Sequence, residues 1–292
     1  MSVAVIINPA SGRATSEDVR RRVELASASL SAHGEQGEVF VSRARGQARE
    51  LSTAALAAGA RIVIAWGGDG TVNEVASPLV GTNTALGIVP AGSGNGLARE
   101  LGIDRDPARA LERAFGNALR TIDAGELGGR LFFNVAGIGF DARVAECFDR
   151  DRGGRRGLAT YIRITVRELL RYQPALYRID PGDGPRRALL VTFANGRQFG
   201  NSALIAPTAR PDDGFLDLVV FEERSRLSTL QGLPHLFTGG ITRVEGVSIT
   251  PIRHASVEAD RPMGFHVDGE PLQGGSRLEA RVVPSCLRVV VG

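Results

Sequence analysis

An apolar segment that leads directly into a glycine-rich turn places the strongest constraint on how this chain can fold. Residues 62–66 are five consecutive apolar residues, Ile-Val-Ile-Ala-Trp, which predict a short strand buried on both faces. Residues 67–70 are Gly-Gly-Asp-Gly, and a helical pattern begins at Thr71. Glycines allow the backbone to approach a ligand closely, and the N–H groups of a first helical turn attract anions. The segment therefore predicts a cradle for phosphate groups.

Asp69, within this turn, has two interpretations. A carboxylate beside phosphates is repulsive unless a metal or a proton donor mediates, so Asp69 would hold Mg²⁺ or accept a proton from an attacking hydroxyl. Alternatively, the segment is a tight strand-to-helix turn in which Asp69 is only an N-cap. The turn by itself leaves both interpretations open.

The basic residues of the chain exclude two common nucleotide-binding motifs. The 292 residues include 35 basic and 32 acidic side chains, for a net charge of +3, and every one of the 35 is arginine. A P-loop and a protein kinase both require a lysine, so neither can exist here. If nucleotide phosphates bind, backbone N–H groups, Mg²⁺ and arginine must neutralise their charge.

Composition predicts a soluble globular protein. The hydrophobic content is 43%, and no apolar run approaches the ~20 residues of a membrane-spanning helix. The first nine residues lack a basic leader and predict a strand, not a signal peptide. Cys147 and Cys286 form no pattern of disulfides or metal ligands. We therefore expect a cytoplasmic protein that is long enough for two domains.

Strands and helices alternate four times in the first 123 residues. The expected strands are residues 3–7, 39–41, 62–66 and 85–90, and the expected helices are residues 17–30, 46–58, 72–80 and a helix from 97. This alternation predicts an α/β domain with a parallel sheet between two layers of helices, similar to a Rossmann fold. Ligands of such sheets bind at the carboxyl ends of the strands. Four polar side chains fall at these ends: Asn8, Ser42, Asp69 and Ser93.

The pattern changes near residue 124. Short apolar runs between glycine, proline and aspartate turns predict strands at residues 131–136, 175–180, 187–194, 215–221, 247–250, 254–258 and 264–267. These strands predict an all-β sandwich domain over residues 124–280, following the α/β domain of residues 1–123.

Residues 137–142, Gly-Ile-Gly-Phe-Asp-Ala, fit the G-x-G-x-x-A fingerprint of dinucleotide-binding folds. The acidic residue expected about 20 positions later is missing, and the motif lies in the β-rich half of the chain. We therefore do not expect a dehydrogenase.

Residues 158–172 have the spacing of an amphipathic helix. Its apolar side would consist of Leu158, Tyr161, Ile162, Val166, Leu169 and Leu170. Arginines recur at positions 163, 167 and 171, and more precede the helix at 150, 152, 155 and 156. Such a helix can rest on an anionic membrane surface. The alternative, which we slightly favour, is a helix packed on the sandwich with a solvated arginine face.

Two acidic turns complete the candidate residues. Residues 210–215, Arg-Pro-Asp-Asp-Gly-Phe, place two carboxylates in one turn, which suits a hard cation that also binds carbonyl oxygens. Residues 268–270, Asp-Gly-Glu, would bring two carboxylates to the tip of a hairpin. Each also has an ordinary interpretation as a polar turn with solvated charges.

With these residues in place, the chain resembles the diacylglycerol kinase/sphingosine kinase family of lipid kinases, which shares its nucleotide site with NAD kinases. The resemblance covers almost the whole length, and six motifs appear in the family order. They are Asn8-Pro9-x-Ser11-Gly12, Gly67-Gly68-Asp69-Gly70-Thr71-x-Asn73-Glu74, Pro90-x-Gly92-Ser93-Gly94-Asn95, Asn134-x-x-Gly137-x-Gly139-Phe140-Asp141, Asp212-Asp213-Gly214 and Asp268-Gly269-Glu270.

The resemblance implies a nucleotide-binding α/β domain, a β-sandwich domain for the lipid substrate and an active site in the cleft between them. It also implies that residues 281–292 rejoin the first domain. ATP and Mg²⁺ would be the cofactors, and the hydroxyl of a membrane lipid would receive the γ-phosphoryl group. The residues that would line the ATP site are Asn8, Ser11, Gly12, Ser42, Gly68, Asp69, Gly70, Thr71, Asn73, Glu74 and Ser93.

The resemblance further implies chemical roles. Asp69 would organise the triphosphate and Mg²⁺. Glu270 matches the residue proposed in bacterial relatives to deprotonate the lipid hydroxyl, a role that Asp69 could share. The carboxylate of Asp213, with the main-chain oxygens of Arg210 and Phe215, matches a structural Mg²⁺ site in bacterial relatives.

The chain also departs from the family pattern. Residues 92–96, Gly-Ser-Gly-Asn-Gly, replace the Gly-Thr-x-Asn-Asp of many bacterial diacylglycerol kinases and look closer to the sphingosine/ceramide kinase branch. The acceptor therefore stays open between diacylglycerol and a sphingoid-like lipid. Ser42 stands where threonine is more usual but keeps the hydroxyl.

Two other functions and several partners follow from the same residues. The alternative functions are a soluble phosphotransferase similar to NAD kinase, and a catalytically silent regulator that binds nucleotide or lipid. We expect no nucleic-acid binding, because the arginine cluster lacks interleaved stacking aromatics. The resemblance implies contact with the inner membrane face and a homodimer.

Overall fold

The computed structural model of the chain describes residues 2–150, 158–182, 184–200 and 203–291, and it divides into two compact units. The first unit consists of residues 1–122 and 285–292, and the second consists of residues 123–284. The limits expected from the sequence were residues 123 and 280. The last strand pairs with strands of both units, which are described separately.

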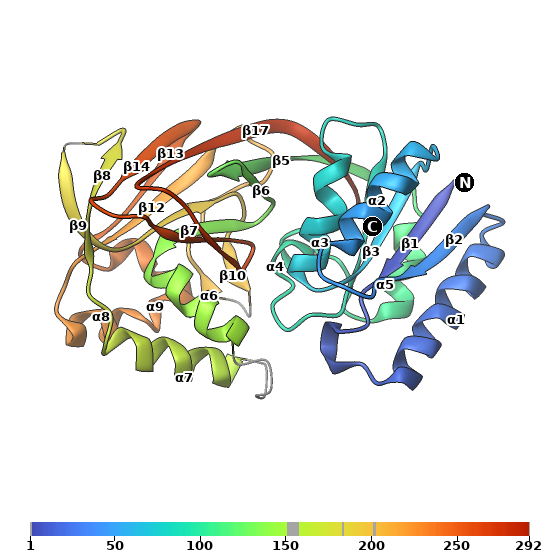
Figure 1. Cartoon of the computed structure of the whole chain (residues 1–292), viewed down its shortest axis with the longest axis horizontal. Coiled ribbons are helices and arrows are strands. Elements are labelled where there is room, and N and C mark those ends of the chain that lie inside the picture. The colour runs from blue at the N-terminus through green and yellow to red at the C-terminus, as the bar shows by residue number, and fades with distance from the viewer. Residues whose placement is uncertain (1, 151–157, 183, 201–202, 292) are drawn as a thin grey trace. The chain divides into compact units, whose positions relative to one another are not determined.

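The first unit contains a parallel sheet (Figure 1). Its strands are β1 (Val3–Ile7), β2 (Gly37–Val41), β3 (Ile62–Gly67), β4 (Ala85–Pro90) and the end of β17 (Arg277–Val290). Their order is β17-β4-β3-β1-β2, with every pairing parallel. All residues of β1, β3 and β4 are buried, as a sheet covered on both faces requires. The predicted parallel sheet is therefore confirmed.

Five helices cover this sheet. They are α1 (Ser16–Ala32), α2 (Gln47–Ala57), α3 (Asp69–Ala76), α4 (Gly96–Glu100) and α5 (Pro107–Ala114). Helix α1 packs with α5, and α2 packs with α3. A capping box of Thr15 and Asp18 begins α1. The helix expected over residues 72–80 is shorter, because α3 ends at Ala76 and Pro78 lies in a 3-10 turn over Ser77–Leu79.

The second unit is built from mostly short antiparallel strands. They are β5 (Leu119–Leu127), β6 (Arg130–Phe132), β7 (Val135–Gly139), β8 (Ala175–Asp180), β9 (Pro185–Ala194), β10 (Gln198–Gly200), β11 (Ala203–Leu204), β12 (Leu216–Glu222), β13 (Val247–Ile252), β14 (His254–Glu258), β15 (Gly264–Val267), β16 (Glu270–Gln273) and the first part of β17. Strand β9 pairs with β7, β8 and β12, and β14 joins β8 to β17. Apolar side chains of these strands form one buried core.

Helices accompany the strands of the second unit (Figure 1). They are α6 (Phe140–Arg150), α7 (Leu158–Leu169), α8 (Arg226–Gly232), α9 (His235–Thr238) and a 3-10 turn over Ile241–Arg243. Helices α6 and α7 pack together over β9 and share a second apolar cluster with it. The predicted combination of an α/β domain and a β sandwich is confirmed, with these helices added to the sandwich.

Two details of the second unit differ from the sequence-based prediction. The strand expected over residues 131–136 is two strands, β6 and β7, because the N–H groups of Phe133 and Asn134 bind Asp268. The helix expected over residues 158–172 ends at Leu169, and its buried side matches the predicted one only in part. Leu169 is buried and Tyr161 packs against the same cluster, as predicted. Ile164 is 1% exposed, whereas Ile162 on the predicted apolar side is 43% exposed.

Candidate functional site

The carboxyl ends of β1 and β3 are joined by side-chain hydrogen bonds in the first unit. The amide of Asn8 donates to the hydroxyl of Thr71 over 2.7 Å, and its carbonyl accepts the N–H of Ala10 over 2.9 Å. The hydroxyl of Ser11 accepts the N–H of Gly68 over 3.2 Å. Asn8, Ser11, Gly68 and Thr71, four of the predicted ATP-site residues, therefore lie together at one edge of the sheet.

Arg22 of α1 also reaches this edge, and the sequence analysis missed it. Its guanidinium donates to the main-chain oxygen of Ser11 over 3.1 Å and to that of Asn8 over 3.4 Å. Burial lowers the pKa of Arg22, although the group stays charged at neutral pH. A half-buried cation that is held by carbonyl oxygens beside the turn can attract an anionic ligand. Arg22 belongs to no motif, and its place at this edge results from the packing of α1. The sequence alone therefore did not indicate it.

Asp69 is not an N-cap, which corrects one of its two interpretations. The N-cap of α3 is Gly68, and Asp69 is the first helical residue. The carboxylate instead spans to the next glycine turn, where Oδ2 accepts the N–H of Asn95 over 2.8 Å and Oδ1 accepts that of Gly96 over 2.7 Å. Asp69 thus holds the start of α4 against the start of α3.

Three turns of the first unit approach so closely that only glycine fits. A Cβ at Gly92 would lie 2.6 Å from the Cα of Gly68, and one at Gly94 would lie 2.9 Å from Oδ2 of Asp69. A Cβ at Gly12, which has a φ of 72°, would lie 2.7 Å from the oxygen of Ala91. The edge therefore presents bare backbone next to a carboxylate. This arrangement fits a bound triphosphate and its divalent cation.

The other predicted ATP-site residues have mixed surroundings. Ser42 is buried after β2, and its N–H donates to the oxygen of Ile7 over 2.9 Å. Glu74 accepts the N–H of Gly46 over 3.0 Å, which ties α3 to the start of α2. Asn73 is buried and accepts from the hydroxyl of Ser77 over 3.3 Å, whereas Ser93 is exposed. The side chains of Glu74 and Asn73 therefore hold α3 to its neighbouring segments.

Glu270 begins β16 after a two-residue hairpin turn in the second unit. Asp268 and Gly269 have φ values of 47° and 83°, which define a type I′ turn, and Val267 pairs with Glu270. Asp268 is not a solvated turn charge. Its carboxylate accepts the N–H groups of residues 133–135 at 3.0, 3.0 and 3.1 Å. The hairpin is therefore anchored to the start of β7.

A buried polar cluster lies behind this hairpin, around Asp141. Its Oδ2 accepts the hydroxyl of Thr192 over 2.7 Å and lies 3.4 Å from Nε2 of His266. A Cβ at Gly137 would lie only 1.8 Å from the same oxygen. The first glycine of the G-x-G-x-x-A sequence thus makes room for Asp141, not for a dinucleotide. Thr192 and His266 carried no signal in the sequence.

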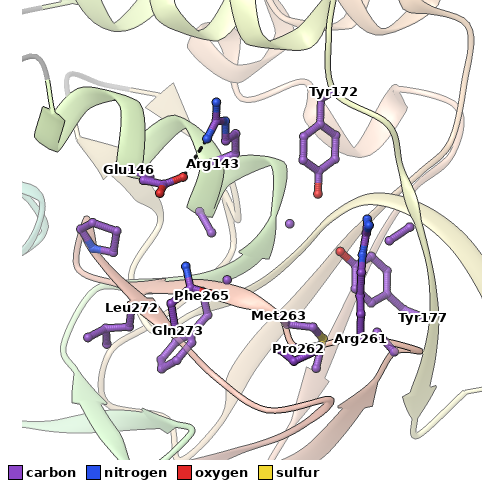
Figure 2. A pocket seen from close by; sticks show the side chains of 16 residues that line it. Arg143, Glu146, Tyr172, Tyr177, Arg261, Pro262, Met263, Phe265, Leu272 and Gln273 are labelled. Carbon is purple, nitrogen blue, oxygen red and sulfur yellow. Dashed lines mark hydrogen bonds and ion pairs between the residues drawn. The ribbon is translucent and has the colours of Figure 1, made fainter.

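A cavity of about 570 Å³ opens beside the hairpin (Figure 2). Its lining combines apolar and polar groups in nearly equal measure, which suits a small amphipathic molecule. The lining residues are Gly139, Ala142, Arg143, Glu146, Tyr172, Ala175, Tyr177, Ala259, Arg261, Pro262, Met263, Gly264, Phe265, Pro271, Leu272 and Gln273. Pro271 and Leu272 directly follow Glu270, so one wall of the cavity belongs to the same strand as that carboxylate.

Two tyrosine hydroxyls and one arginine form the polar part of this cavity. Burial raises the pKa of Tyr172 and of Tyr177, and the two hydroxyls interact with each other. A Cβ at Gly139 would lie 3.0 Å from the hydroxyl of Tyr177 and 3.3 Å from that of Tyr172. The guanidinium of Arg261 lies close enough to act on both hydroxyls (Figure 2). Neutral hydroxyls and a cation together suit a ligand oxygen.

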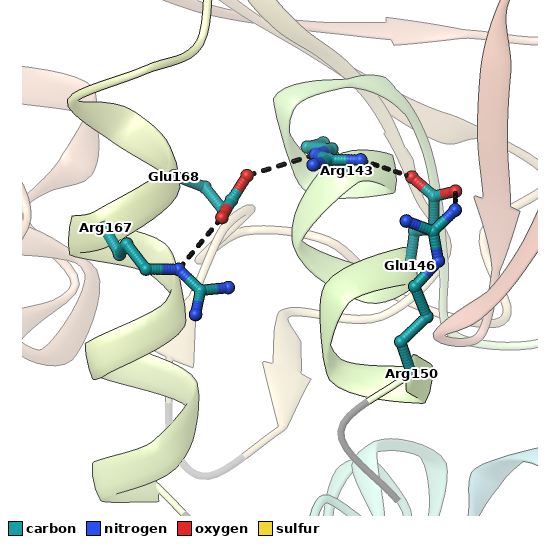
Figure 3. A network of polar contacts seen from close by, with 5 residues as sticks. All are labelled: Arg143, Glu146, Arg150, Arg167 and Glu168. Atoms are coloured by element: carbon teal, nitrogen blue, oxygen red, sulfur yellow. Dashed lines mark hydrogen bonds and ion pairs between the residues drawn. The ribbon is translucent and has the colours of Figure 1, made fainter.

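Arg143 connects the cavity to a polar network between α6 and α7 (Figure 3). It donates to Glu168 over 3.1 Å and to Glu146 over 2.9 Å, and Arg167 donates to Glu168 over 3.0 Å. Burial alone would raise the pKa of Glu168, but the two arginines offset burial and hold that pKa below its ordinary value. The network fixes Arg143 at the cavity wall and explains why Glu168 faces the core.

The acidic turn of residues 210–215 lies in the second unit. Oδ1 of Asp213 accepts the N–H of Phe215 over 3.0 Å, and the N–H of Gly214 donates to Asp123 over 2.7 Å. Burial raises the pKa of Asp217, and the charge of Asp213 raises it further. Within the described part of the chain, no group of three or more His, Cys, Asp or Glu could hold a metal. The predicted ligands, one carboxylate and two main-chain oxygens, stay a prediction.

The helix considered for membrane contact is only partly described. Arg152, Arg155 and Arg156 lie outside the described residues, whereas Arg163 and Arg167 are exposed on α7. Across the described ranges, no helix combines the length and apolarity needed to cross a bilayer.

Two family models match the chain in succession. The model of the diacylglycerol kinase catalytic domain matches residues 2–127. The model of the YegS C-terminal NAD kinase beta sandwich-like domain matches residues 134–291. The change from one model to the next falls where the α/β unit gives way to the sandwich.

Curated relatives are similar over most of their length. A probable lipid kinase YegS-like from Pseudomonas aeruginosa PAO1 is 35% identical over 283 residues, which cover 95% of this chain and 90% of the relative. A diacylglycerol kinase from Mycobacterium tuberculosis H37Rv is 33% identical over 256 residues, which cover 83% of this chain and 81% of the relative.

Solved structures share the fold at lower identity. The crystal structure of a putative diacylglycerol kinase from Bacillus anthracis str. Sterne has a TM-score of 0.82 at 20% identity and covers 100% of this chain and 95% of that chain. The crystal structure of an NAD kinase from Archaeoglobus fulgidus in complex with ATP has a TM-score of 0.53 at 12% identity, with 99% and 93% covered.

Proposed function

Because the chain belongs to the lipid kinase family that joins a diacylglycerol kinase catalytic domain to a β-sandwich-like domain, we propose that it transfers the γ-phosphoryl group of ATP to a lipid hydroxyl with the help of Mg²⁺. The observation that carries the proposal is the meeting of three glycine turns around the carboxylate of Asp69. Bare backbone and one carboxylate are the groups that a nucleotide site without lysine needs.

The first unit would bind the nucleotide. The turns at Gly12, Gly68 and Gly92 would let the phosphates approach backbone N–H groups, and Arg22 would add positive charge behind them. Asp69 would hold Mg²⁺, which supplies the charge that offsets the transferring phosphoryl group when bound. Ser93, exposed at the same edge, would contact the phosphates.

The second unit would bind the lipid. The cavity next to β16 combines apolar walls with the hydroxyls of Tyr172 and Tyr177 and the guanidinium of Arg261, which suits the polar backbone of an acyl lipid. Glu270 begins the strand that forms one wall, so the carboxylate would face the reacting end of the lipid.

The phosphoryl group would pass directly from ATP to the lipid, without a covalent enzyme intermediate. The lipid oxygen forms a bond to the γ-phosphorus while the bond from that phosphorus to the bridging oxygen breaks, and ADP leaves. The hydroxyl proton passes to a carboxylate, either Glu270 or Asp69. Alignment of the hydroxyl with the phosphorus would contribute most of the remaining acceleration.

A lipid acceptor also requires a membrane surface. Helix α7 exposes Ile162 together with Arg163 and Arg167, and Leu170, the residue after the helix, is exposed as well. This combination suits the anionic inner face of a membrane. We therefore propose that the protein works as a peripheral membrane enzyme that docks through α7.

The test is transfer of labelled γ-phosphate from ATP and Mg²⁺ to a panel of acceptors in mixed micelles. The panel contains diacylglycerol, monoacylglycerol, phosphatidylglycerol, sphingosine, ceramide and, as a soluble control, NAD. We expect label in one lipid, and its loss in Asp69→Ala and Glu270→Ala. Label in NAD alone would show that the protein is an NAD kinase and not a lipid kinase. Unchanged turnover in both variants would show that Asp69 and Glu270 have no part in catalysis.

A further inference from the structure

The turn before Glu270 has two N–H groups that make no hydrogen bond within the strand ladder of the hairpin. In a two-residue turn the strand ladder closes between the flanking residues, here Val267 and Glu270, so the N–H groups of the two turn residues need other partners. The N–H of Asp268 donates to the oxygen of Val135 over 2.9 Å. The N–H of Gly269 donates to Nδ1 of His266 over 3.3 Å.

This hydrogen bond indicates the tautomer of the imidazole. Because Nδ1 accepts, the hydrogen of the neutral ring is on Nε2. Nε2 lies 3.4 Å from Oδ2 of Asp141, which also accepts the hydroxyl of Thr192 over 2.7 Å. His266 is 4% exposed and Asp141 is 5% exposed, so neither can exchange these partners for water. The ring is therefore held between the buried carboxylate and the turn.

We infer that His266 is a positioning residue for Glu270. By accepting the Gly269 N–H, it fixes the plane of the peptide that joins Asp268 to Gly269, and this plane sets the direction in which the chain enters β16. The inference rests on the proposed function, since it gives the Glu270 carboxylate a place in proton transfer. A base displaced by about 1 Å commonly costs up to ~10²-fold in rate.

A simpler role for His266 would be to fill the core and to accompany Asp141. Its ring lies near that of Phe199, with centroids 6.5 Å apart. The two roles depend on different ring atoms, because positioning uses Nδ1 and the buried pair uses Nε2. Two substitutions separate them. His266→Asn places an amide oxygen near the position of Nδ1 and nothing near Nε2, and His266→Gln does the reverse.

The experiment compares steady-state kinetics and thermal unfolding of both variants in the full-length protein. We expect His266→Gln to lower kcat at least about tenfold with an unchanged KM for ATP. His266→Asn should keep kcat within about twofold of the original protein, although its Tm falls. Thr192→Val is the matched control, because it disturbs Asp141 without touching the turn and should lower Tm alone. Equal kcat losses in the two His266 variants, or an unchanged kcat in His266→Gln, would overturn the inference.

Hydrogen–deuterium exchange tests the same contact without any catalytic assay. Amides of residues 264–273 should exchange faster in His266→Gln than in His266→Asn or the original protein. If the original protein phosphorylates no lipid and this difference is still found, the contact stands and the proposed function fails. Equal exchange in all three proteins would refute the contact even if the kinase assay succeeds.

Discussion

Asp69 in the first unit and Asp268 in the second unit occur in similar sequences, each beside glycine in a turn that follows a buried strand. Their carboxylates nevertheless have different partners. Asp69 accepts one N–H at each oxygen, from Asn95 and Gly96. The carboxylate of Asp268 accepts three, from residues 133–135.

The partners differ in their surroundings as well as in number. Residues 95 and 96 are buried at the start of a five-residue helix, but the exposed Ser93 lies two positions before Asn95. Residues 133–135 are buried between two strands. Removing an acceptor from buried N–H groups leaves them unsatisfied, so the cost grows with the number of N–H groups that a carboxylate binds. We therefore expect Asp69, with two partners beside an exposed turn, to be the less structural of the two carboxylates, and Asp268, with three, to be the more structural.

The largest effect should follow replacement of Asp69. Asp69→Asn keeps an oxygen for one N–H but loses the charge that would bind Mg²⁺ or take a proton, so we expect a loss of about 10²–10⁴-fold in kcat. The free energy of unfolding should fall by about 1–2 kcal/mol, because one buried N–H group loses its acceptor. The lipid kinase assay and urea unfolding measure both. Glu38→Gln, at an exposed position on β2 of the same unit, should leave both unchanged. An active Asp69→Asn protein would break the comparison.

Replacement of Asp268 should act on stability instead. In Asp268→Asn the amide NH₂ would face N–H groups that need an acceptor, and we expect a loss of about 3 kcal/mol in the free energy of unfolding. Asp260→Asn, at an exposed position between β14 and β15, is the matched control and should cost less than about 0.5 kcal/mol. If Asp268→Asn unfolds at the original urea concentration, its hydrogen bonds are not the anchor of the hairpin.

Arg261→Gln should affect the lipid and not the nucleotide. Its guanidinium lines the cavity beside the two tyrosines, so we expect KM for the lipid acceptor to rise about tenfold while KM for ATP stays unchanged. Arg178→Gln, at an exposed position on β8, provides the comparison. A rise in KM for ATP would place Arg261 at the nucleotide, and the division of tasks between the two units would need revision.

The smallest effect concerns the pH dependence of the network between α6 and α7. Arg143 and Arg167 hold the pKa of Glu168 below its ordinary value near 4.5 despite burial. A lowered pKa stabilises the fold above the ordinary value, and this stabilisation disappears as the pH falls through the folded-state pKa. Glu168→Gln should therefore cost about 1–2 kcal/mol at pH 7 and less near pH 3. The exposed Glu38→Gln should show no such dependence. A cost that is equal at both pH values would exclude the ion pairs as its source.

Local patterns were sufficient to predict much of the fold. The strand at residues 62–67 follows from an uninterrupted apolar run, and the Asp-Gly pair at 268 and 269 indicates a two-residue hairpin by itself. The edge with Asn8, Asp69 and Thr71 could be predicted because parallel strands align their carboxyl ends. These features depend on residues close together in sequence.

Contacts between distant residues could not be predicted. Asp268 binds N–H groups more than 130 positions earlier, and nothing in Asp-Gly-Glu indicates them. The buried side of α7 was predicted only in part. Tyr161 and Leu169 pack inward as expected, but periodicity treats Glu168 as exposed, whereas Arg143 of α6 draws it inward. Arg22 and His266 were missed for the same reason, since each acquires its role from a partner on another element.

The long strand β17 has a consequence for synthesis of the protein. Its last part pairs Val289 with Leu86 of β4, a residue about 200 positions earlier in the chain. At the usual ~5–20 residues per second, a ribosome needs roughly 10–40 s to make the intervening segment. Throughout that interval the edge of β4 lacks its neighbour and stays open to other chains. The α/β unit is therefore the first to be translated but cannot be the first to be finished.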